Sequence, residues 1–156
     1  MYYLRRYAYA KIAYELRLHG RPAAEIAPAL VELPHPAGDL RDLYRMLMSR
    51  AYGFELNDAE SQRYRSDVDD TFYSADYARA FVLAGMMHDG IRRRFGEDWY
   101  ANKEVGAFLR KELFSEGTAL SAEDVAAKLG FPPRVDFDAA AARAARLVAD
   151  ADALEK

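Results

Sequence analysis

The sequence predicts an all-α fold: a bundle of about six or seven helices, with one long central helix near residues 70–95. Apolar residues recur at three- and four-residue spacing in nearly every segment, which is the period of an amphipathic helix. Glycine and proline separate these segments, and no pair of segments alternates as strands do. A length of 156 residues with 51% hydrophobic residues predicts a single helical domain, residues 1–156.

The first helix is expected over residues 2–19, and Gly20 ends it. Prolines interrupt residues 21–38, so only a short helix at Ala23–Ala27 is expected in that connector. Tyrosines lie around most of the circumference of the first helix, which predicts partners on nearly all sides, either by self-association or through a second chain. They are Tyr2, Tyr3, Tyr7, Tyr9 and Tyr14.

The second strong helical pattern is "GDLRDLYRMLMSRAYG", with Asp39 as its N-cap and Gly53 as its end. Asn57 is suited to cap a short helix through "DAESQRYRSDV". The long helix then runs from about Asp70 to Phe95. Its N-terminal acids in "DVDD" are expected to interact favourably with the helix dipole. The expected buried stripe of the earlier helix is Leu40, Leu43, Leu47 and Ala51.

Three helices are expected in the remaining third of the chain. One covers about residues 102–114, and the next opens at "SAED", which has the spacing of a capping box, and ends at Gly130. The last is an alanine-rich helix to about residue 153, capped by Asp136 or Asp138.

Composition excludes several classes of function. The formal net charge of −3 gives no basic field for nucleic acid, and the runs Arg5-Arg6 and Arg92–Arg94 are expected to be solvated helix faces. No apolar stretch is long enough to span a membrane. The absence of cysteine and of a signal-peptide pattern favours a cytoplasmic protein without disulfides or a thiol nucleophile.

The candidate site residues are Tyr73 and Tyr77, which are four residues apart and therefore share one face of the long helix. A tyrosine hydroxyl that faces a cleft can donate to a peptide carbonyl or an oxyanion. The alternative is that both rings belong to the core, with their hydroxyls paired to backbone or carboxylate.

No metal site is predicted. The only imidazoles are His19, His35 and His88, and no His-Glu-x-x-His pattern brings two of them one helical turn apart. His88 is expected to be a packing residue bonded to a carboxylate or a carbonyl.

The segments "YYLRRYAYAKIAYELRLHG", "RYRSDVDDTFYSADYARAFVLAGMMHDGIRRRFGEDWYANKEVGAFLRKELFSEG" and "SAEDVAAKLGF" together resemble the C-terminal helical portion of a gluzincin zinc metallopeptidase. The similar groups are thimet oligopeptidase, oligopeptidase F, carboxypeptidase Taq and angiotensin-converting enzyme. The resemblance rests on a Tyr-x-x-x-Tyr helix followed by "FGEDWYANKEVGAFL", and it covers most of the chain.

This resemblance implies the C-terminal, substrate-cleft portion of an oligopeptidase-like hydrolase, with Tyr73 and Tyr77 binding the peptide substrate and Tyr77 stabilising the oxyanion. The zinc would be held by a missing upstream part that carries His-Glu-x-x-His, so this chain holds no cofactor and is not expected to be catalytic alone. Two positions depart from the family pattern: "SDVDD" stands where a histidine is usual, and Ala80 replaces a third tyrosine. The alternatives are a non-catalytic, all-α protein-interaction module derived from that fold, and a small ligand-binding protein that uses the tyrosine-rich face of residues 2–19.

Overall fold

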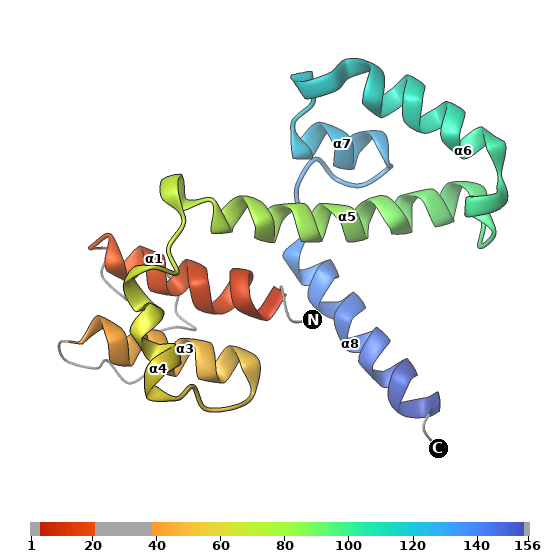
Figure 1. Cartoon of the computed structure of the whole chain (residues 1–156). Helices are drawn as coiled ribbons and strands as arrows, with labels where there is room; N and C mark the ends of the chain where they lie inside the picture. Colours follow the sequence, from red (N-terminus) through yellow and green to blue (C-terminus); the bar gives the residue numbers. More distant parts are fainter. Residues whose placement is uncertain (1–3, 21–38, 155–156) are drawn as a thin grey trace. The chain divides into compact units, whose positions relative to one another are not determined.

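The computed structural model describes residues 4–20 and 39–154, and these residues form seven α-helices and no strand, as predicted (Figure 1). The predicted helix at Ala23–Ala27, and the residues Tyr2, Tyr3 and His35, lie outside the described residues. The helices are α1 (Ile12–Leu18), α3 (Leu40–Tyr52), α4 (Asp58–Ser61), α5 (Ser74–Phe95), α6 (Lys103–Phe108), α7 (Ala122–Lys128) and α8 (Phe137–Leu154).

Shorter helical segments extend these elements. A π-helical segment, Leu4–Lys11, runs directly into α1, and another, Leu109–Leu113, continues α6. The chain divides into two compact units, Met1–Ala78 and Arg79–Lys156, with the boundary inside α5. The assignment of residues 1–156 to one domain stays a prediction.

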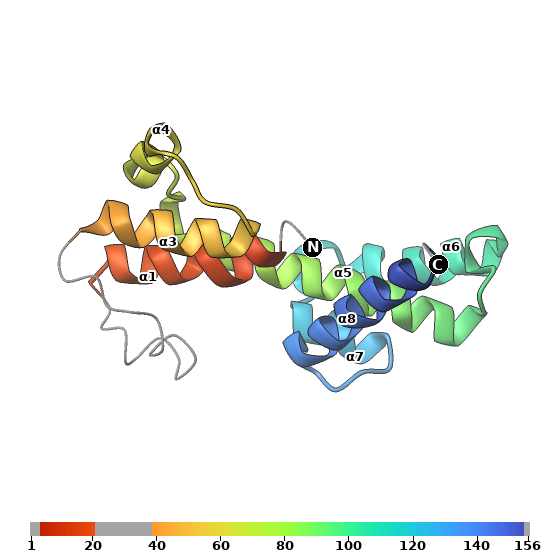
Figure 2. The same ribbon diagram turned by 90° about the horizontal axis from the view of Figure 1, so that it is seen from below.

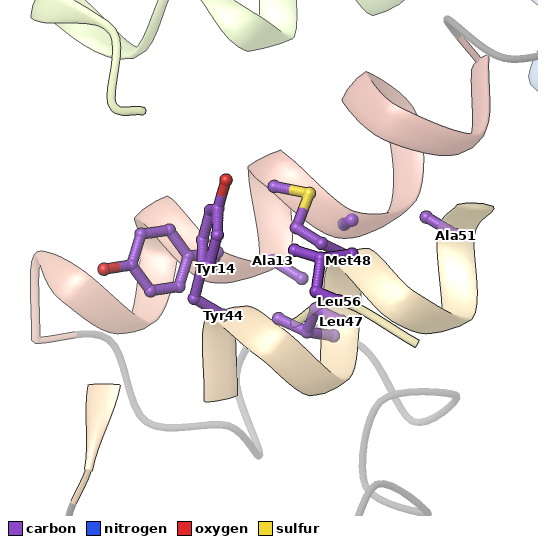
Figure 3. Close-up of a cluster of buried hydrophobic side chains, with 8 residues drawn as sticks. Ala13, Tyr14, Tyr44, Leu47, Met48, Ala51 and Leu56 are labelled. Carbon is purple, nitrogen blue, oxygen red and sulfur yellow. The ribbon is translucent and has the colours of Figure 1, made fainter. Parts of the chain in front are cut away.

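The core of the first unit lies between α1 and α3, which are side by side and run in opposite directions (Figure 2). Tyr14 from α1 meets Tyr44 from α3 edge to face, with ring centroids 5.1 Å apart (Figure 3). Of the predicted stripe on α3, Leu47 and Ala51 are buried while Leu40 and Leu43 are only partly so. The remaining buried members of this core are Ala10, Ala13, Met48 and Leu56.

Most of the predicted helix caps are confirmed. The Asp39 carboxylate accepts a hydrogen bond from the Arg41 amide, and Asn57 forms a capping box with Glu60. Ser121 forms the predicted capping box with Asp124. Of the two acids proposed for α8, Asp136 is the cap, since its carboxylate accepts from the Ala139 amide at 3.0 Å.

The long helix begins later than the sequence predicts, at Ser74 instead of about Asp70. Thr71 and Phe72 have φ angles of 61° and 60°, a left-handed conformation that cannot continue a right-handed helix. Such backbone costs of order 1–3 kcal/mol per residue, so surrounding contacts must hold it. Ser74 provides such contacts, because its hydroxyl is 2.7 Å from Asp69 Oδ2 and 3.2 Å from Glu15 Oε1.

The core of the second unit forms where α6, its π-helical continuation and the end of α7 pack against α5. Its buried residues are Ile91, Val105, Phe108, Leu113 and Leu129. Gly90 makes close packing possible at this place: a Cβ there would lie 3.0 Å from Leu129 Cβ and 3.2 Å from Phe131 Cε2.

Candidate functional site

Tyr73 and Tyr77 lie one helical turn apart at the N-terminal end of α5. The Tyr77 amide donates to the Tyr73 carbonyl at 3.2 Å, and the two rings meet edge to face with centroids 4.9 Å apart. Their side chains are 50% and 41% exposed. The alternative that places both tyrosines in the core is therefore wrong for this structure.

A third tyrosine from the N-terminal helix completes this group. Tyr7 stacks on Tyr77 with ring centroids 5.0 Å apart and an interplanar angle of 23°. We call Tyr7, Tyr73 and Tyr77 the tyrosine cluster. Offset stacked and edge-to-face pairs of this kind contribute about 0.5–1.5 kcal/mol each beyond the area they bury, so the cluster fixes the directions of the two exposed rings.

The hydroxyls of Tyr73 and Tyr77 differ from those of the core tyrosines. Tyr14 donates to the Tyr64 carbonyl, and Tyr44 donates to Asp67 Oδ2 at 2.7 Å. Burial raises the pKa of Tyr14 to about 12 and also raises that of Tyr44, for which the Asp67 carboxylate is a further cause. Within the described residues, neither Tyr73 nor Tyr77 has a hydrogen-bond partner for its hydroxyl.

Charged side chains are buried directly behind the tyrosine cluster. Lys11 is 3% exposed, and its Nζ lies 2.9 Å from Asp69 Oδ1 and 3.3 Å from Asp67 Oδ1. Arg6 pairs with the same oxygen of Asp67. Both cations also lie over the Tyr7 ring, at 5.6 Å for Arg6 and 5.7 Å for Lys11. We call Arg6, Lys11, Glu15, Asp67 and Asp69 the charge network.

Glu15 is the most deeply buried member of the charge network. It is 0% exposed, its Oε1 accepts from the Asp69 amide at 2.9 Å, and the Ser74 hydroxyl oxygen lies 3.2 Å from the same atom. Its Oε2 has no hydrogen-bond partner among the residues that the structure describes. Burial raises the pKa of the Glu15 carboxyl, while the Asp69 amide and Lys11 act in the opposite direction. A protonated Glu15 leaves two cations facing two carboxylates, so the network is then neutral.

The pKa of Asp69 is shifted in the opposite direction. Burial alone would raise its pKa, but hydrogen bonds from Lys11 and Ser74, together with the positive charge of Lys11, outweigh that effect and lower the pKa. Asp69 therefore stays ionised at neutral pH and keeps its contact with Lys11.

Replacing Glu15 with glutamine should make stability less dependent on pH. Because the folded-state pKa of Glu15 is raised, its contribution to stability is complete below the unfolded value of about 4.3 and is lost as pH rises through the folded-state pKa. Glu15→Gln keeps the Oε1 acceptor and removes this titration. Urea unfolding should therefore show Glu15→Gln gaining stability relative to the wild type as pH rises above about 4.3. The exposed substitution Glu116→Gln is the control, and an equal gain there would contradict the prediction.

The charge network corrects two expectations from the sequence. Arg6 was expected on a solvated helix face, but its side chain is only 14% exposed because it pairs with Asp67. The first acids of "DVDD" were expected at the N-terminus of the long helix, but Asp67 is buried and pairs with cations of the N-terminal helix. Asp76 is the acid that lies in the first turn of α5.

Sequence reasoning missed Lys11, Glu15 and the role of Tyr7. A signal was present, because Lys11 and Glu15 are four residues apart beside Ala10 and Tyr14, which form the buried face of the same helix. Two charges of opposite sign within a buried face indicate an internal ion pair. That Asp67 and Asp69 are the partners of Lys11 and Glu15 could not be predicted in this way, because they lie more than fifty residues away in the sequence.

His88 lies beside several polar groups and an aromatic ring. Its Nδ1 is 3.2 Å from Arg143 Nη2 and 3.5 Å from Asp89 Oδ1, and the ring meets Trp99 edge to face. The predicted carboxylate neighbour of His88 is therefore present, and Arg143 is a second polar neighbour that the sequence did not predict. Within residues 4–20 and 39–154, no group of three or more potential ligand side chains is arranged to hold a metal ion.

The fold and the tyrosine cluster define an all-α protein with paired, exposed phenols at the start of its longest helix. Comparisons with protein-family models, with curated proteins and with solved structures give no match for this chain. In the part of the chain that the structure describes, no helix has both the length and the apolar character needed to cross a membrane.

Proposed function

We propose that this chain is the C-terminal, substrate-cleft portion of a zinc metallopeptidase-like protein, in which Tyr73 and Tyr77 bind the peptide substrate. The observation that supports this proposal is the pair of exposed tyrosines one helical turn apart, whose hydroxyls have no partner among the described residues. Both side chains are exposed, and a tyrosine hydroxyl can donate one hydrogen bond and accept others, so these two hydroxyls are available to a ligand.

The spacing of the two tyrosines suits a peptide backbone. One helical turn rises about 5.4 Å. In an extended peptide, residues two apart present their carbonyls on the same side at a separation of roughly 6.6 Å. These two spacings are similar, so Tyr73 and Tyr77 can donate to alternate carbonyls of one extended peptide.

The described residues do not fit a zinc site, so the proposal assigns zinc to another part of the protein. The chain alone should hydrolyse no peptide and bind no stoichiometric zinc. Its own contribution would be two hydrogen-bond donors, one of which, Tyr77, would contact the oxyanion of the tetrahedral intermediate. Metal analysis that finds one zinc per isolated chain would contradict this assignment.

The test of the proposed function is peptide binding by the isolated chain. An unstructured peptide should bind, and the double variant Tyr73→Phe/Tyr77→Phe should bind it about tenfold more weakly, because each lost hydrogen bond is worth about 0.5–1.5 kcal/mol. Tyr100→Phe is the control, since Tyr100 is 74% exposed and belongs to the other unit. Equal binding by all three proteins would refute a role for the two hydroxyls.

The same exposed rings would also suit the second candidate, a protein-interaction module that self-associates or docks to a second chain. Phenylalanine and alanine variants separate the two candidates. An interface that buries the Tyr77 ring tolerates Tyr77→Phe but loses affinity in Tyr77→Ala, whereas hydrogen bonding to a peptide is lost in both. If light scattering shows that the wild-type chain is a monomer and that Tyr77→Ala leaves its mass unchanged, self-association through this ring is excluded.

A further inference from the structure

A hollow of about 380 Å³ lies on the second unit, and none of the residues that line it belongs to the tyrosine cluster. Its volume falls within the range of about 300–1,000 Å³ that is typical of small-molecule sites. Residues of α5, of α8 and of the segments that follow α5 and α7 line it. They are Asp89, Arg92, Arg93, Glu97, Phe131 and Arg146.

The charges around this hollow are unevenly paired. It is lined by three arginines and two carboxylates, a local balance of +1 on a chain whose formal net charge is −3. Arg92 Nη2 lies 2.6 Å from Glu97 Oε1, so the charges of Arg92 and Glu97 are paired with each other. Asp89 has a further cation outside the hollow, because Arg143 Nη1 lies 3.6 Å from its Oδ1.

Two cations therefore remain for a ligand. Among the described residues, neither Arg93 nor Arg146 has a carboxylate oxygen within ion-pair distance. They come from different helices, α5 and α8, and line the same hollow. An anion bound at this hollow would interact favourably with both guanidinium groups.

The Arg93 guanidinium is held in place by an aromatic ring. Its Cζ lies 4.0 Å from the centroid of Phe131. Phe131 is itself fixed by a Schellman motif, in which its amide donates to the Ala126 carbonyl at 3.0 Å and Gly130 takes a φ of 83°. Gly90, one turn earlier on α5, lets the helix approach the ring closely, since a Cβ there would lie 3.2 Å from Phe131 Cε2. A stacked arginine of this kind keeps its N–H donors directed away from the ring and loses little entropy on binding.

We propose that this hollow is a binding site for a phosphoryl group, held by Arg93 and Arg146. Arginine pairs with phosphate and carboxylate through two parallel hydrogen bonds. A carboxylate has two oxygens and one negative charge, so a single guanidinium satisfies it. A phosphate monoester carries up to two charges and three free oxygens, which match two guanidinium groups from different helices.

The test is titration of the full chain with inorganic phosphate and phenyl phosphate at constant ionic strength, followed by amide NMR. Saturable shifts are expected at Gly90, Arg93 and Phe131, and Arg93→Gln or Arg146→Gln should each weaken binding about tenfold. The same titration is then made with acetate and benzoate, which should bind at least tenfold more weakly than the two phosphates.

Arg110→Gln provides the matched control, because Arg110 is an exposed arginine of the same unit that does not line the hollow. It removes the same charge and should change affinity less than twofold. The proposal is overturned by shifts that do not saturate, by acetate binding as well as phosphate, or by Arg110→Gln weakening binding as much as Arg146→Gln. Far-UV circular dichroism on each variant checks that the helices are intact.

Discussion

Lys11→Met should destabilise the first unit by about 3 kcal/mol, the lower end of the range for removing one partner of a buried ion pair. Methionine fills a similar volume, so the loss is electrostatic. Without Lys11, Asp69 loses its cation at 2.9 Å, and Asp67 keeps Arg6 as its one cation together with the hydrogen bond from Tyr44. Hydrogen exchange of the α1 and α3 amides should speed up roughly 150-fold, since each 1.4 kcal/mol corresponds to a factor of ten.

Two variants make this prediction specific to the charge network. Lys111→Met is the control, because the Lys111 side chain is 84% exposed, and a surface change of this kind is usually within about 0.5 kcal/mol of neutral. Adding Asp69→Asn to Lys11→Met removes the uncompensated carboxylate and keeps an acceptor for the Ser74 hydroxyl. The double variant should therefore recover part of the loss. If Lys11→Met costs no more than Lys111→Met, the network is not an important source of stability.

Tyr77→Phe should lower the turnover of a completed peptidase by about a hundred- to a thousandfold, the typical cost of losing one hydrogen-bond donor to an oxyanion. This prediction rests on the proposed function and requires a fusion or complex that supplies a His-Glu-x-x-His portion. The variant removes only a hydroxyl, and the Tyr77 ring keeps its contacts with Tyr7 and Tyr73. The measurement is the hydrolysis rate of a fluorogenic peptide at saturating substrate.

The roles of the two tyrosines can be separated in the same assay. Tyr73→Phe should mainly raise KM, because a group that binds substrate and transition state equally affects binding and not turnover. Tyr100→Phe should change neither constant. Full turnover by the completed Tyr77→Phe enzyme would refute the oxyanion role, and a completed protein without any activity would favour the interaction module.

The helical architecture was predictable because its signals are local. Caps such as Asp39, Asn57 and Ser121 act on amides two or three residues away, and Gly53 ends α3 through its own φ of 80°. The exposure of Tyr73 and Tyr77 was not predictable in this way, because helical spacing says which residues share a face but not whether another element covers that face. The choice between a core and a surface position needed the packing of the first unit.

The start of α5 shows the same limit. The sequence favours a helix from Asp70, but Asp69 and Ser74 bond to each other and to Glu15 and Lys11 of the N-terminal helix, and these contacts accompany the left-handed turn at Thr71 and Phe72. Contacts between residues more than fifty positions apart outweigh a local preference of a fraction of a kcal/mol per residue.

The sequence by itself determined an all-α protein, most of its helix boundaries and the shared face of Tyr73 and Tyr77, because each follows from helical periodicity and from capping within a few residues. Only the tertiary structure decided which charges are buried, that Tyr7 stacks on Tyr77, and that Arg93 and Arg146 line one hollow. These features depend on which distant segments meet. The hydrophobic effect is non-directional, so the apolar pattern of one segment does not say which other segment it packs against.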